Sequence, residues 1–405
     1  MKGKRAQSSF SNKDLAVIRE KVNASIDFLH AVDDCEVRKK IEQEVSRFSE
    51  NRMLSLSQKI ALANGVFNSI RGLDIIQPLV EDDEINEIMV NGYKDIFIER
   101  AGKIEKLKIE FDSKERLDSV LQKIVGEINR VVNEASPIVD ARLNDGSRVN
   151  IVLAPLAIDG SVMTIRKFPK KALDMADLVE NGAISEEAVC FLKEMICARY
   201  NIFICGGTSS GKTTLLNSLA GLIPAHERLI TIEDSAELQI KGRENLIRLE
   251  TRNANCEGRG EISMDELIKT SLRMRPDRII VGEVRGRECF SMLQAMNTGH
   301  DGSLSTGHAN SPNDMISRLE AMVLMASQMP IDAARRQIVS ALEIMIHTSR
   351  MRDGSRKVME ISELISDGKD KISFNKLFEM EGGRLKAVND NLIKSKKRDD
   401  FKNEG

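Results

Sequence analysis

One stretch decides the fold of this chain: Gly206-Gly207-Thr208-Ser209-Ser210-Gly211-Lys212-Thr213-Thr214, a complete phosphate-binding loop of the form G-x-x-x-x-G-K-[ST]. The apolar run before it, residues 201–205, predicts a short buried strand, and residues 214–220 after it predict a helix. A strand, loop and helix in this order direct backbone N–H groups and a helix N-terminus toward one small volume. The stretch therefore predicts a binding site for a nucleoside triphosphate.

The residue types in this loop each have a chemical reason. Glycine lets the backbone adopt φ values, and approach a phosphate, where a Cβ would interfere. Lys212 can reach the β- and γ-phosphates, and the Thr213 hydroxyl is placed to ligate Mg²⁺. The alternative is a Gly- and Ser-rich turn that matches the pattern by chance. The flanking strand and helix disfavour that alternative.

Length and composition narrow the class of protein. A chain of 405 residues is long enough for about two to three domains, and 41% apolar with 30% charged residues is ordinary for a soluble globular protein. Lys and Arg number 60 against 62 Asp and Glu, so sequence-independent binding to nucleic acid is not expected. Trp is absent and Tyr occurs twice, which leaves few side chains for stacking on bases.

The cysteines and the apolar pattern indicate a cytosolic protein. Six cysteines show no C-x-x-C spacing, which favours a reducing compartment and gives no sign of a zinc site. No apolar stretch approaches the roughly 20 residues that span a bilayer. The basic start, residues 1–5, lacks the apolar region of a secretory signal. We expect a cytoplasmic protein, or one attached to the membrane through partners.

Four segments follow one another along the sequence. Apolar residues at helical spacing predict a helical N-terminal segment, with breaks near Asp33-Asp34 and Ser55. A mixed α/β pattern follows, and Pro169-Lys170-Lys171 marks a boundary before a region of alternating strands and helices. The last residues, including the basic run 394–398, are expected to be a solvated tail. The expected segments are 1–74 (helical), 75–168 (α/β), 169–380 (P-loop domain with a C-terminal hairpin) and 381–405 (polar tail).

Three hairpins are expected from turn residues. Asp145-Gly146 lies between the alternating runs 138–143 and 148–153, and Asp-Gly between such runs is a strong hairpin signal. Asp353-Gly354 joins two further runs, and Ala101-Gly102-Lys103 joins residues 95–100 to 104–107.

Two apolar runs end in carboxylates. Residues 278–282 lead to Glu283, the Walker B position, where a carboxylate can orient or deprotonate the attacking water. Residues 229–232 lead to Glu233 and Asp234, which could bind Mg²⁺ through water or position the nucleophile. The alternative for both is an ordinary solvated strand end.

Two of the five histidines, His300 and His308, lie in the polar, Gly-rich stretch 299–310. Histidines in loops are often incidental. Because Ser and Thr accompany these two inside a P-loop domain, we expect them to sense the γ-phosphate.

In combination, these elements resemble the type II/IV secretion ATPases. The loop, the Glu233-Asp234 strand end, the stretch from residue 273 to Gly282-Glu283 and the histidine segment fall in that superfamily's order and spacing. They are similar to its Walker A, Asp box, atypical Walker B and His box. Residues 140–150, 164–168 and 295–303 resemble the narrower CpaF-like branch, the motors of tight-adherence (Flp) pilus assembly. The resemblance covers roughly residues 75 to 365.

The resemblance implies an α/β fold, in which a RecA-like P-loop ATPase domain follows a smaller α/β (PAS-like) N-terminal domain and a helical N-terminal segment. It implies a hexameric ring that hydrolyses ATP with Mg²⁺ and powers pilus assembly or protein secretion through an inner-membrane platform. ATP would lie in the cleft between the two domains, where Glu283 activates water with help from Glu233 and His308 senses the γ-phosphate. Arginines reach the same cleft, and Arg142, Arg148 and Arg166 match the family's positions.

The hairpin geometry leaves the arginines ambiguous. An even-length turn at Asp145-Gly146 puts Arg142 and Arg148 on opposite faces, whereas a three-residue turn puts them side by side. Two departures from the family are also visible. Gly307 precedes His308 where the family has an apolar residue, which could loosen the sensor, and the paired C-x-x-C zinc insertion of some type II motors is missing.

Competing hypotheses stay open. A motor for conjugative transfer of DNA or protein would use the same mechanism. A non-hydrolysing ATP-binding regulator is disfavoured by the intact Lys212, Thr213 and Glu283, and a P-loop small-molecule kinase by the lack of an acceptor lid.

Overall fold

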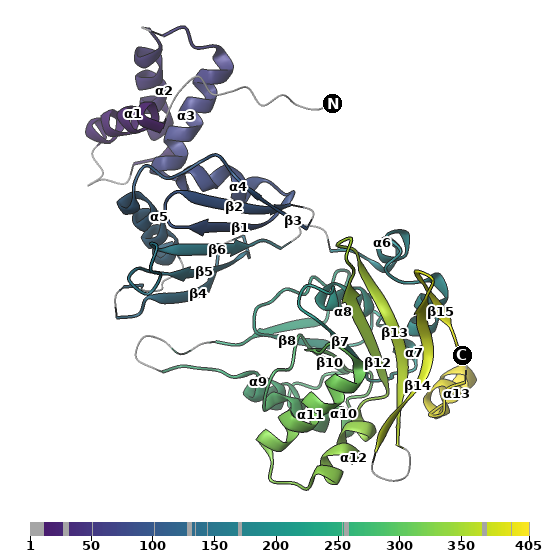
Figure 1. Ribbon diagram of the computed structural model, residues 1–405. Helices are drawn as coiled ribbons and strands as arrows, with labels where there is room; N and C mark the ends of the chain where they lie inside the picture. Colours follow the sequence, from purple (N-terminus) through teal and green to yellow (C-terminus); the bar gives the residue numbers. More distant parts are fainter. Residues whose placement is uncertain are drawn as a thin grey trace. The chain divides into compact units, whose positions relative to one another are not determined.

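The computed structural model describes residues 12–26, 32–50, 52–100, 102–127, 132–133, 135–143, 145–168, 172–252, 254, 259–366, 371–389 and 391–404. The chain divides into two compact units, Met1–Lys170 and Lys171–Gly405, and each is considered by itself (Figure 1). The expected boundary Pro169-Lys170-Lys171, the turn residues Ala101 and Asn144, and Cys256 lie outside the described residues.

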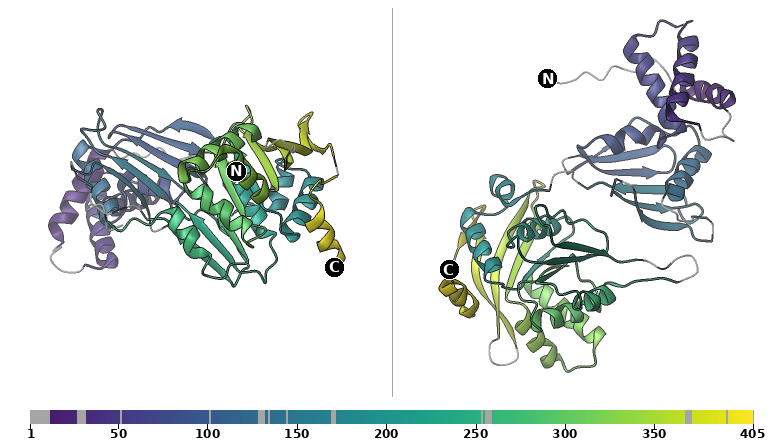
Figure 2. Two further views of the ribbon diagram at one scale, coloured as in Figure 1. Left: turned by 90° about the horizontal axis from the view of Figure 1, so that it is seen from below. Right: turned by 180° about the vertical axis from the view of Figure 1, so that it is seen from behind.

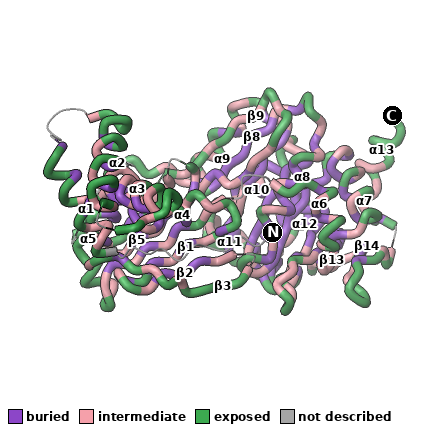
Figure 3. Tube along the Cα trace, turned by 90° about the horizontal axis from the view of Figure 1, so that it is seen from above, coloured by how far each residue is buried: buried purple, intermediate pink, exposed green. Residues whose placement is uncertain are grey.

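The first unit begins with three packed helices, α1 (Asn12–Ser25), α2 (Asp34–Glu50) and α3 (Leu56–Ile70). Each helix is buried along one side, as helical spacing of the apolar residues requires (Figure 3). Ile18, Ile41 and Val66 form the centre of their common core. Ser55 caps α3 and exchanges hydrogen bonds with Gln58 in a capping box, so the predicted break at Ser55 is confirmed.

A six-stranded antiparallel sheet follows in the same unit, in the order β3-β2-β1-β6-β5-β4. The helix α5 packs on one face of this sheet, where Leu121 and Ile124 share a core with Ile88, Ile98 and Ile151 (Figure 2). The side chains on the other face, such as Glu87, Asn150 and Arg166, are half-buried or exposed, because strand residues alternate between the faces. The strands and helices are η1 (Asp74–Ile76), α4 (Gln77–Glu81), β1 (Ile85–Asn91), β2 (Asp95–Arg100), β3 (Lys103–Lys106), α5 (Lys114–Glu127), β4 (Ile138–Arg142), β5 (Arg148–Val152) and β6 (Val162–Arg166).

The second unit is built on a nine-stranded sheet, in the order β15-β14-β13-β12-β7-β11-β10-β8-β9. The strands from β12 to β9 in this order are parallel, and β12 to β15 are joined by antiparallel pairs. Its strands are β7 (Ile202–Gly206), β8 (Leu229–Glu233), β9 (Leu246–Glu250), β10 (Arg278–Val281), β11 (Leu304–His308), β12 (Ile344–Arg350), β13 (Arg356–Ser366), β14 (Ile372–Glu381) and β15 (Arg384–Ala387). The Asp353-Gly354 hairpin is confirmed by β12 and β13.

Helices cover both faces of the parallel strands, as expected for a wound α/β domain (Figures 1 and 2). One core contains α7 and α8 side chains such as Leu192 and Leu216 with Ile204, and the other contains side chains of α9 to α12 with Phe203. β7, β8 and β10 are buried throughout, which explains their continuous apolar sequences. The helices are α6 (Met175–Glu180), α7 (Glu186–Cys197), α8 (Lys212–Gly221), α9 (Met264–Ser271), α10 (Glu288–Asn297), α11 (Pro312–Ala326), α12 (Ile331–Ala341) and α13 (Lys396–Glu404).

The C-terminal residues differ from the expected solvated tail. β15 extends the sheet beyond residue 381, and the first turn of α13 is bound to the unit. Lys397 Nζ lies 2.7 Å from Asp301 Oδ1 and 2.9 Å from Glu343 Oε2, and Arg398 Nε lies 3.0 Å from Glu194 Oε1. The basic run therefore pairs with acids supplied by α7, the turn before β11 and the residue before β12. The sequence did not show that these distant acids lie together.

Within the described ranges, no helix has the length and apolarity needed to cross a bilayer. The described part also contains no group of three or more His, Cys, Asp or Glu side chains arranged to hold a metal ion.

The contact between the phosphate-binding loop and β12 gives a stability test. A Cβ on Gly206 would lie 2.4 Å from Thr348 O and 2.5 Å from Ser210 Oγ, whereas a Cβ on Gly207 meets nothing within 4 Å. We expect Gly206→Ala to lower the free energy of unfolding by about 1–3 kcal/mol. The matched variant Gly207→Ala should stay within about 0.5 kcal/mol of wild type. Thermal unfolding without nucleotide measures both, and equal midpoints for the two variants would contradict the expected packing.

Candidate functional site

The carboxyl ends of four adjacent parallel strands gather the predicted residues of the second unit. The sheet order β7-β11-β10-β8 places the phosphate-binding loop, His308, Glu283 and Glu233 side by side along one edge. His308 is aligned with Gly206, and Val281 is aligned with both Ser305 and Ile232. Open α/β sheets bind ligands at this edge.

The loop has the backbone of a phosphate cradle. Gly211 has a φ of +95° and precedes α8, and Ser209 has a φ of +58°, a region that few residues with a side chain adopt. Ser210 Oγ and Thr348 Oγ1 lie 3.0 Å apart and tie the loop to β12. Thr213, in the first turn of α8, is exposed. The N–H groups at the start of this helix suit an anion.

Lys212 is held inside the loop. Its side chain is largely buried, and Nζ donates to Gly207 O at 2.9 Å and to Gly206 O at 3.1 Å. His308 Nδ1 lies 3.1 Å from the same nitrogen. An ammonium group has three protons and no acceptor, so His308 Nδ1 accepts here and its proton is on Nε2.

His308 connects Lys212 to Glu283. Nε2 lies 2.9 Å from Glu283 Oε1, but the two groups are not aligned for a hydrogen bond, and Oε1 has no other hydrogen-bond donor among the described residues. Burial, with the positive charge of Lys212 as the next cause, lowers the pKa of His308. A neutral imidazole at pH 7 fits the tautomer that the Lys212 contact requires.

Glu283 is fixed by its neighbours. Thr306 Oγ1 donates to Gly282 O at 2.7 Å, and Val284 N donates to Thr306 O at 2.9 Å, so β11 holds the residues on both sides of Glu283. The carboxylate thus faces the edge that carries the loop lysine.

Arg285 is a member of the site that the sequence analysis missed. Its Nη2 donates to Glu283 Oε2 at 3.0 Å, and its Nη1 lies 3.4 Å from Asp234 Oδ2. The hydrogen bond with Glu283 is the largest cause of a raised pKa for Arg285. The available signal was the spacing: a cation stands two residues after the strand-end carboxylate. Charges therefore alternate along the edge from Lys212 through Glu283 and Arg285 to Asp234.

Glu233 has backbone partners in the structure. Its Oε2 accepts from Glu237 N at 2.8 Å and from Leu238 N at 2.9 Å, while Oε1 is buried and has no hydrogen-bond partner among the described residues. Gly282 makes room for it, because a Cβ there would lie 3.0 Å from Glu233 Cγ. Burial raises the pKa of this carboxyl to about 7. One oxygen thus holds the turn after β8, and one remains for a ligand.

His300 does not join the site. It lies in the turn before β11, whereas His308 is the last residue of that strand, so the two histidines stand at opposite ends of β11. Its carbonyl accepts from Ser303 Oγ at 2.7 Å within the turn. The expectation that both histidines sense the γ-phosphate is wrong for His300, because the whole of β11 separates them.

Gly307 is tightly packed, contrary to the expectation that it loosens the histidine sensor. A Cβ at this position would lie 2.9 Å from both Met315 Sδ and Phe203 Cζ. The side chains of α11 and β7 occupy the volume that an apolar residue would need.

The three arginines of the first unit lie in a row. Arg142 is paired with Arg148, and Arg148 with Arg166, across β4, β5 and β6. Paired residues of adjacent strands share a face, so the three arginines lie on one face of the sheet. Residues 143–147 form an odd-length connection, which excludes an arrangement with Arg142 and Arg148 on opposite faces. Arg142 Nε donates to Gly146 O at 3.0 Å. The row continues on β1 with Glu87, which is paired with Arg166. The pKa of Glu87 is raised, chiefly by burial, and the positive charge of Arg166 opposes part of this rise.

Comparisons with known proteins identify similar chains. A family model described as Type II/IV secretion system protein matches residues 70–371. A putative conjugal transfer protein of Mycobacterium tuberculosis is 32% identical over 318 residues, which cover 77% of this chain and 90% of that protein. The type IV secretion system protein VirB11 of Brucella suis is 29% identical over 320 residues, which cover 71% of this chain and 88% of that protein.

A solved structure has a similar fold. The X-ray structure of the Yersinia pseudotuberculosis ATPase DotB gives a TM-score of 0.54 at 18% identity, over 76% of this chain and 81% of that chain. At this identity the likeness concerns the fold alone. It agrees with the predicted fold class, a RecA-like P-loop domain preceded by a smaller α/β domain and a helical segment.

The raised pKa of Glu233 predicts how stability changes with pH. Because its pKa is about 7 in the folded protein against an ordinary 4.5, the folded chain holds a proton that the unfolded chain releases between these values. This group's contribution to the free energy of unfolding is therefore full below pH 4.5 and is lost as the pH rises to 7. Glu233→Gln has no proton to lose and keeps an acceptor for the turn. We expect it to gain up to about 3 kcal/mol relative to wild type across this window.

Denaturant unfolding of both proteins over a pH series measures this difference. A difference between wild type and Glu233→Gln that does not change with pH would contradict the raised pKa.

Proposed function

Because the chain belongs to the type II/IV secretion system protein family, which matches residues 70–371, we propose that it is an ATPase that works as a hexameric motor. The motor hydrolyses ATP to ADP and phosphate and powers pilus assembly or protein secretion through an inner-membrane platform. The observation that carries the proposal is the contact series from Lys212 through His308 to Glu283 at the end of three adjacent strands.

Lys212 is the residue that changes partners when ATP binds. Phosphate oxygens are stronger acceptors for an ammonium group than the carbonyls of Gly206 and Gly207 or a neutral imidazole. The β- and γ-phosphates would therefore take Nζ from these groups, which lie 2.9–3.1 Å away. His308 would lose its lysine contact, so its position would report the presence of the γ-phosphate.

Glu283 is the group that would activate water. Its carboxylate lies at the nucleotide edge, and Arg285 holds one oxygen while the other lacks an aligned donor among the described residues. That oxygen can accept the proton of a water molecule directed at the γ-phosphate. His308 Nε2 lies 2.9 Å from the same oxygen.

The site residues fit a magnesium ion. Mg²⁺ in such sites takes one or two protein ligands and completes its shell with phosphate and water oxygens. The exposed hydroxyl of Thr213 would hold it directly, and Glu233, with Oε1 lacking a partner among the described residues, would hold it through water. The ion would neutralise charge on the phosphates.

Further parts of the proposal rest on the family resemblance. Arg142, Arg148 and Arg166 would stabilise the transferring phosphoryl group, and the partners would be further copies of this chain and platform proteins at the inner face of the cell membrane. The CpaF-like branch stays a prediction from sequence patterns.

The second candidate is a conjugative-transfer motor. Its support is the conjugal transfer relative that covers 77% of this chain. Balanced charge, 60 basic against 62 acidic residues, gives direct DNA contact little support, so nucleic acid is not an expected partner. Filter binding of DNA over a salt series separates the two candidates, because a DNA-contacting motor loses affinity steeply with salt.

Substitution of Glu283 tests the proposed hydrolysis. We expect Glu283→Gln to lower kcat by about 10²–10⁴-fold, because the amide cannot take the proton, while ATP affinity stays within a few-fold of wild type. Phosphate release and binding of a fluorescent ATP analogue measure the two quantities. Lys212→Ala serves as the contrast, since it should lose affinity. An unchanged rate for Glu283→Gln would remove this residue as the base.

The arginine row can be tested with a control from the same sheet. We expect Arg142→Ala, Arg148→Ala or Arg166→Ala to lower kcat by at least about 10²-fold for the residues that reach the phosphates. Arg100→Ala on β2, which breaks an ion pair with Asp82, should leave kcat unchanged. Wild-type rates in all three row variants would contradict the proposed role.

A further inference from the structure

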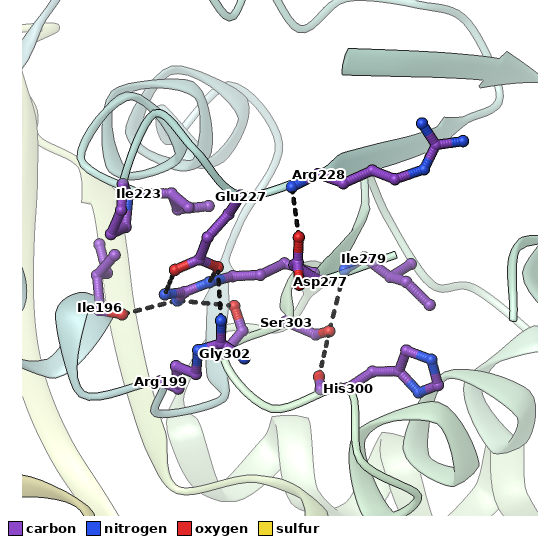
Figure 4. Close-up of polar contacts among 12 residues, drawn as sticks. Ile196, Arg199, Ile223, Glu227, Arg228, Asp277, Ile279, His300, Gly302 and Ser303 are labelled. Atoms are coloured by element: carbon purple, nitrogen blue, oxygen red, sulfur yellow. Dashed lines mark hydrogen bonds and ion pairs between the residues drawn. The ribbon is translucent and has the colours of Figure 1, made fainter. Parts of the chain in front are cut away.

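The amino-terminal edge of the larger sheet contains a buried ion pair that the proposed reaction does not use. Arg278, the first residue of β10, has 0% exposure, and Glu227, in the loop before β8, has 3%. The guanidinium Nε and Nη2 donate to the two carboxylate oxygens at 2.6 and 2.8 Å. Such a two-pronged pair fixes direction as well as charge. Figure 4 shows Glu227, Ile196 and Gly302 around this guanidinium.

The same guanidinium binds two further pieces of backbone. Its Nη1 donates to Ile196 O at 2.7 Å, at the end of α7, and to Gly302 O at 3.4 Å, in the turn before β11. α7 leads through a short turn into β7. A single side chain therefore contacts the chain ahead of β7 and β11, and is itself the start of β10.

The turn before β11 is shaped to this guanidinium. Gly302 has a φ of +80°, and a Cβ there would lie 2.4 Å from Arg278 Nη1. Ser303 adds a second link, since its Oγ accepts from Ile279 N at 3.2 Å and donates to His300 O at 2.7 Å (Figure 4). β10 and the turn before β11 are thus joined by one hydrogen bond from the guanidinium and one to the Ser303 hydroxyl.

These three strands carry the reacting groups at their other ends. β7 leads into the loop of Lys212, β10 into Glu283, and β11 ends in His308. A buried ion pair is often no more stabilising than apolar residues of similar volume, because both charges lose their hydration. The pair of Arg278 and Glu227 therefore differs from an apolar contact in its fixed direction rather than in its contribution to stability.

We infer that Arg278 is a positioning residue for the proposed ATP hydrolysis, on which this inference rests. It fixes how far β10 and β11 project beyond β7, and so sets the distances among Lys212, His308 and Glu283. Hydrogen bonds between strands prevent a change of register, but side chains at the strand ends set the final displacement along the strand axis. A displacement of about 1 Å at reacting groups can cost about 10²-fold in rate.

A double substitution separates positioning from stability. Arg278→Met alone would leave the buried Glu227 with only its longer ion pair to Arg199, at 3.6 Å, and would destabilise the chain for that reason. The pair Arg278→Met and Glu227→Met removes both charges and keeps the volume, but it loses the bonds to Ile196 and Gly302. We expect a melting temperature near that of wild type, unchanged affinity for a fluorescent ATP analogue, and kcat lower by about 10-fold or more.

The matched control is Arg335→Met with Glu320→Met. This ion pair, 2.8 Å long, joins α12 to α11 and contains no residue of β7, β10 or β11. It should keep the wild-type kcat, which shows that loss of an ion pair in this unit does not by itself slow hydrolysis.

Wild-type kcat in the folded double variant would overturn the positioning role. If that variant does not fold, Ser303→Ala decides, since it removes the hydroxyl's bonds to Ile279 N and His300 O and leaves both charges in place. A fall in kcat of about 3-fold or more at unchanged affinity supports the inference, and an unchanged kcat overturns it. Absence of phosphate release by wild type would instead contradict the proposed ATPase function.

Discussion

The parallel alignment of four adjacent strands is the constraint on which the site depends. Because β7, β11, β10 and β8 run in one direction, their carboxyl ends meet at one edge, and the residue that follows each strand is brought to the others. Lys212, His308 and Glu283 are far apart in the sequence. In the structure, His308 Nδ1 lies 3.1 Å from Lys212 Nζ, and His308 Nε2 lies 2.9 Å from Glu283 Oε1. Their strands are buried on both faces, so apolar packing against the covering helices keeps them together in the sheet.

The sequence carries those parts of the structure that are local. A glycine-rich loop between a strand and a helix, an apolar run that ends in Glu283 and an Asp-Gly turn each specify their own conformation over a few residues, and the structure contains them. Arg285 could also be predicted, because a cation two residues beyond Glu283 shares its turn. The row of arginines was ambiguous only in its turn length, which residues 143–147 determine through the pairing of their flanking strands.

Other parts depend on contacts that no local pattern encodes. His300 and His308 lie in the same polar, Gly-rich stretch of sequence, but β11 lies between them, so they stand at opposite ends of that strand. The basic run near Lys397 had the pattern of a solvated tail, and its acidic partners, Asp301 and Glu343, come from two other turns. Arg278 begins an apolar run, and no local pattern indicates that it is the largest fully buried side chain in the described part of the molecule.

The carboxyl and amino ends of the parallel strands in the larger sheet, here called its carboxyl edge and amino edge, therefore differ in how their charged groups are paired. At the carboxyl edge, groups of alternating charge contact one another, and those beyond the largely buried Lys212 are partly exposed, so a lost contact can be replaced by water at small cost. At the amino edge, the pair between Arg278 and Glu227 is almost fully buried, and its loss would leave the Arg278 charge buried without a carboxylate. Most groups that would exchange partners in the proposed reaction lie where water can replace a lost contact, whereas the Arg278–Glu227 pair lies where it cannot.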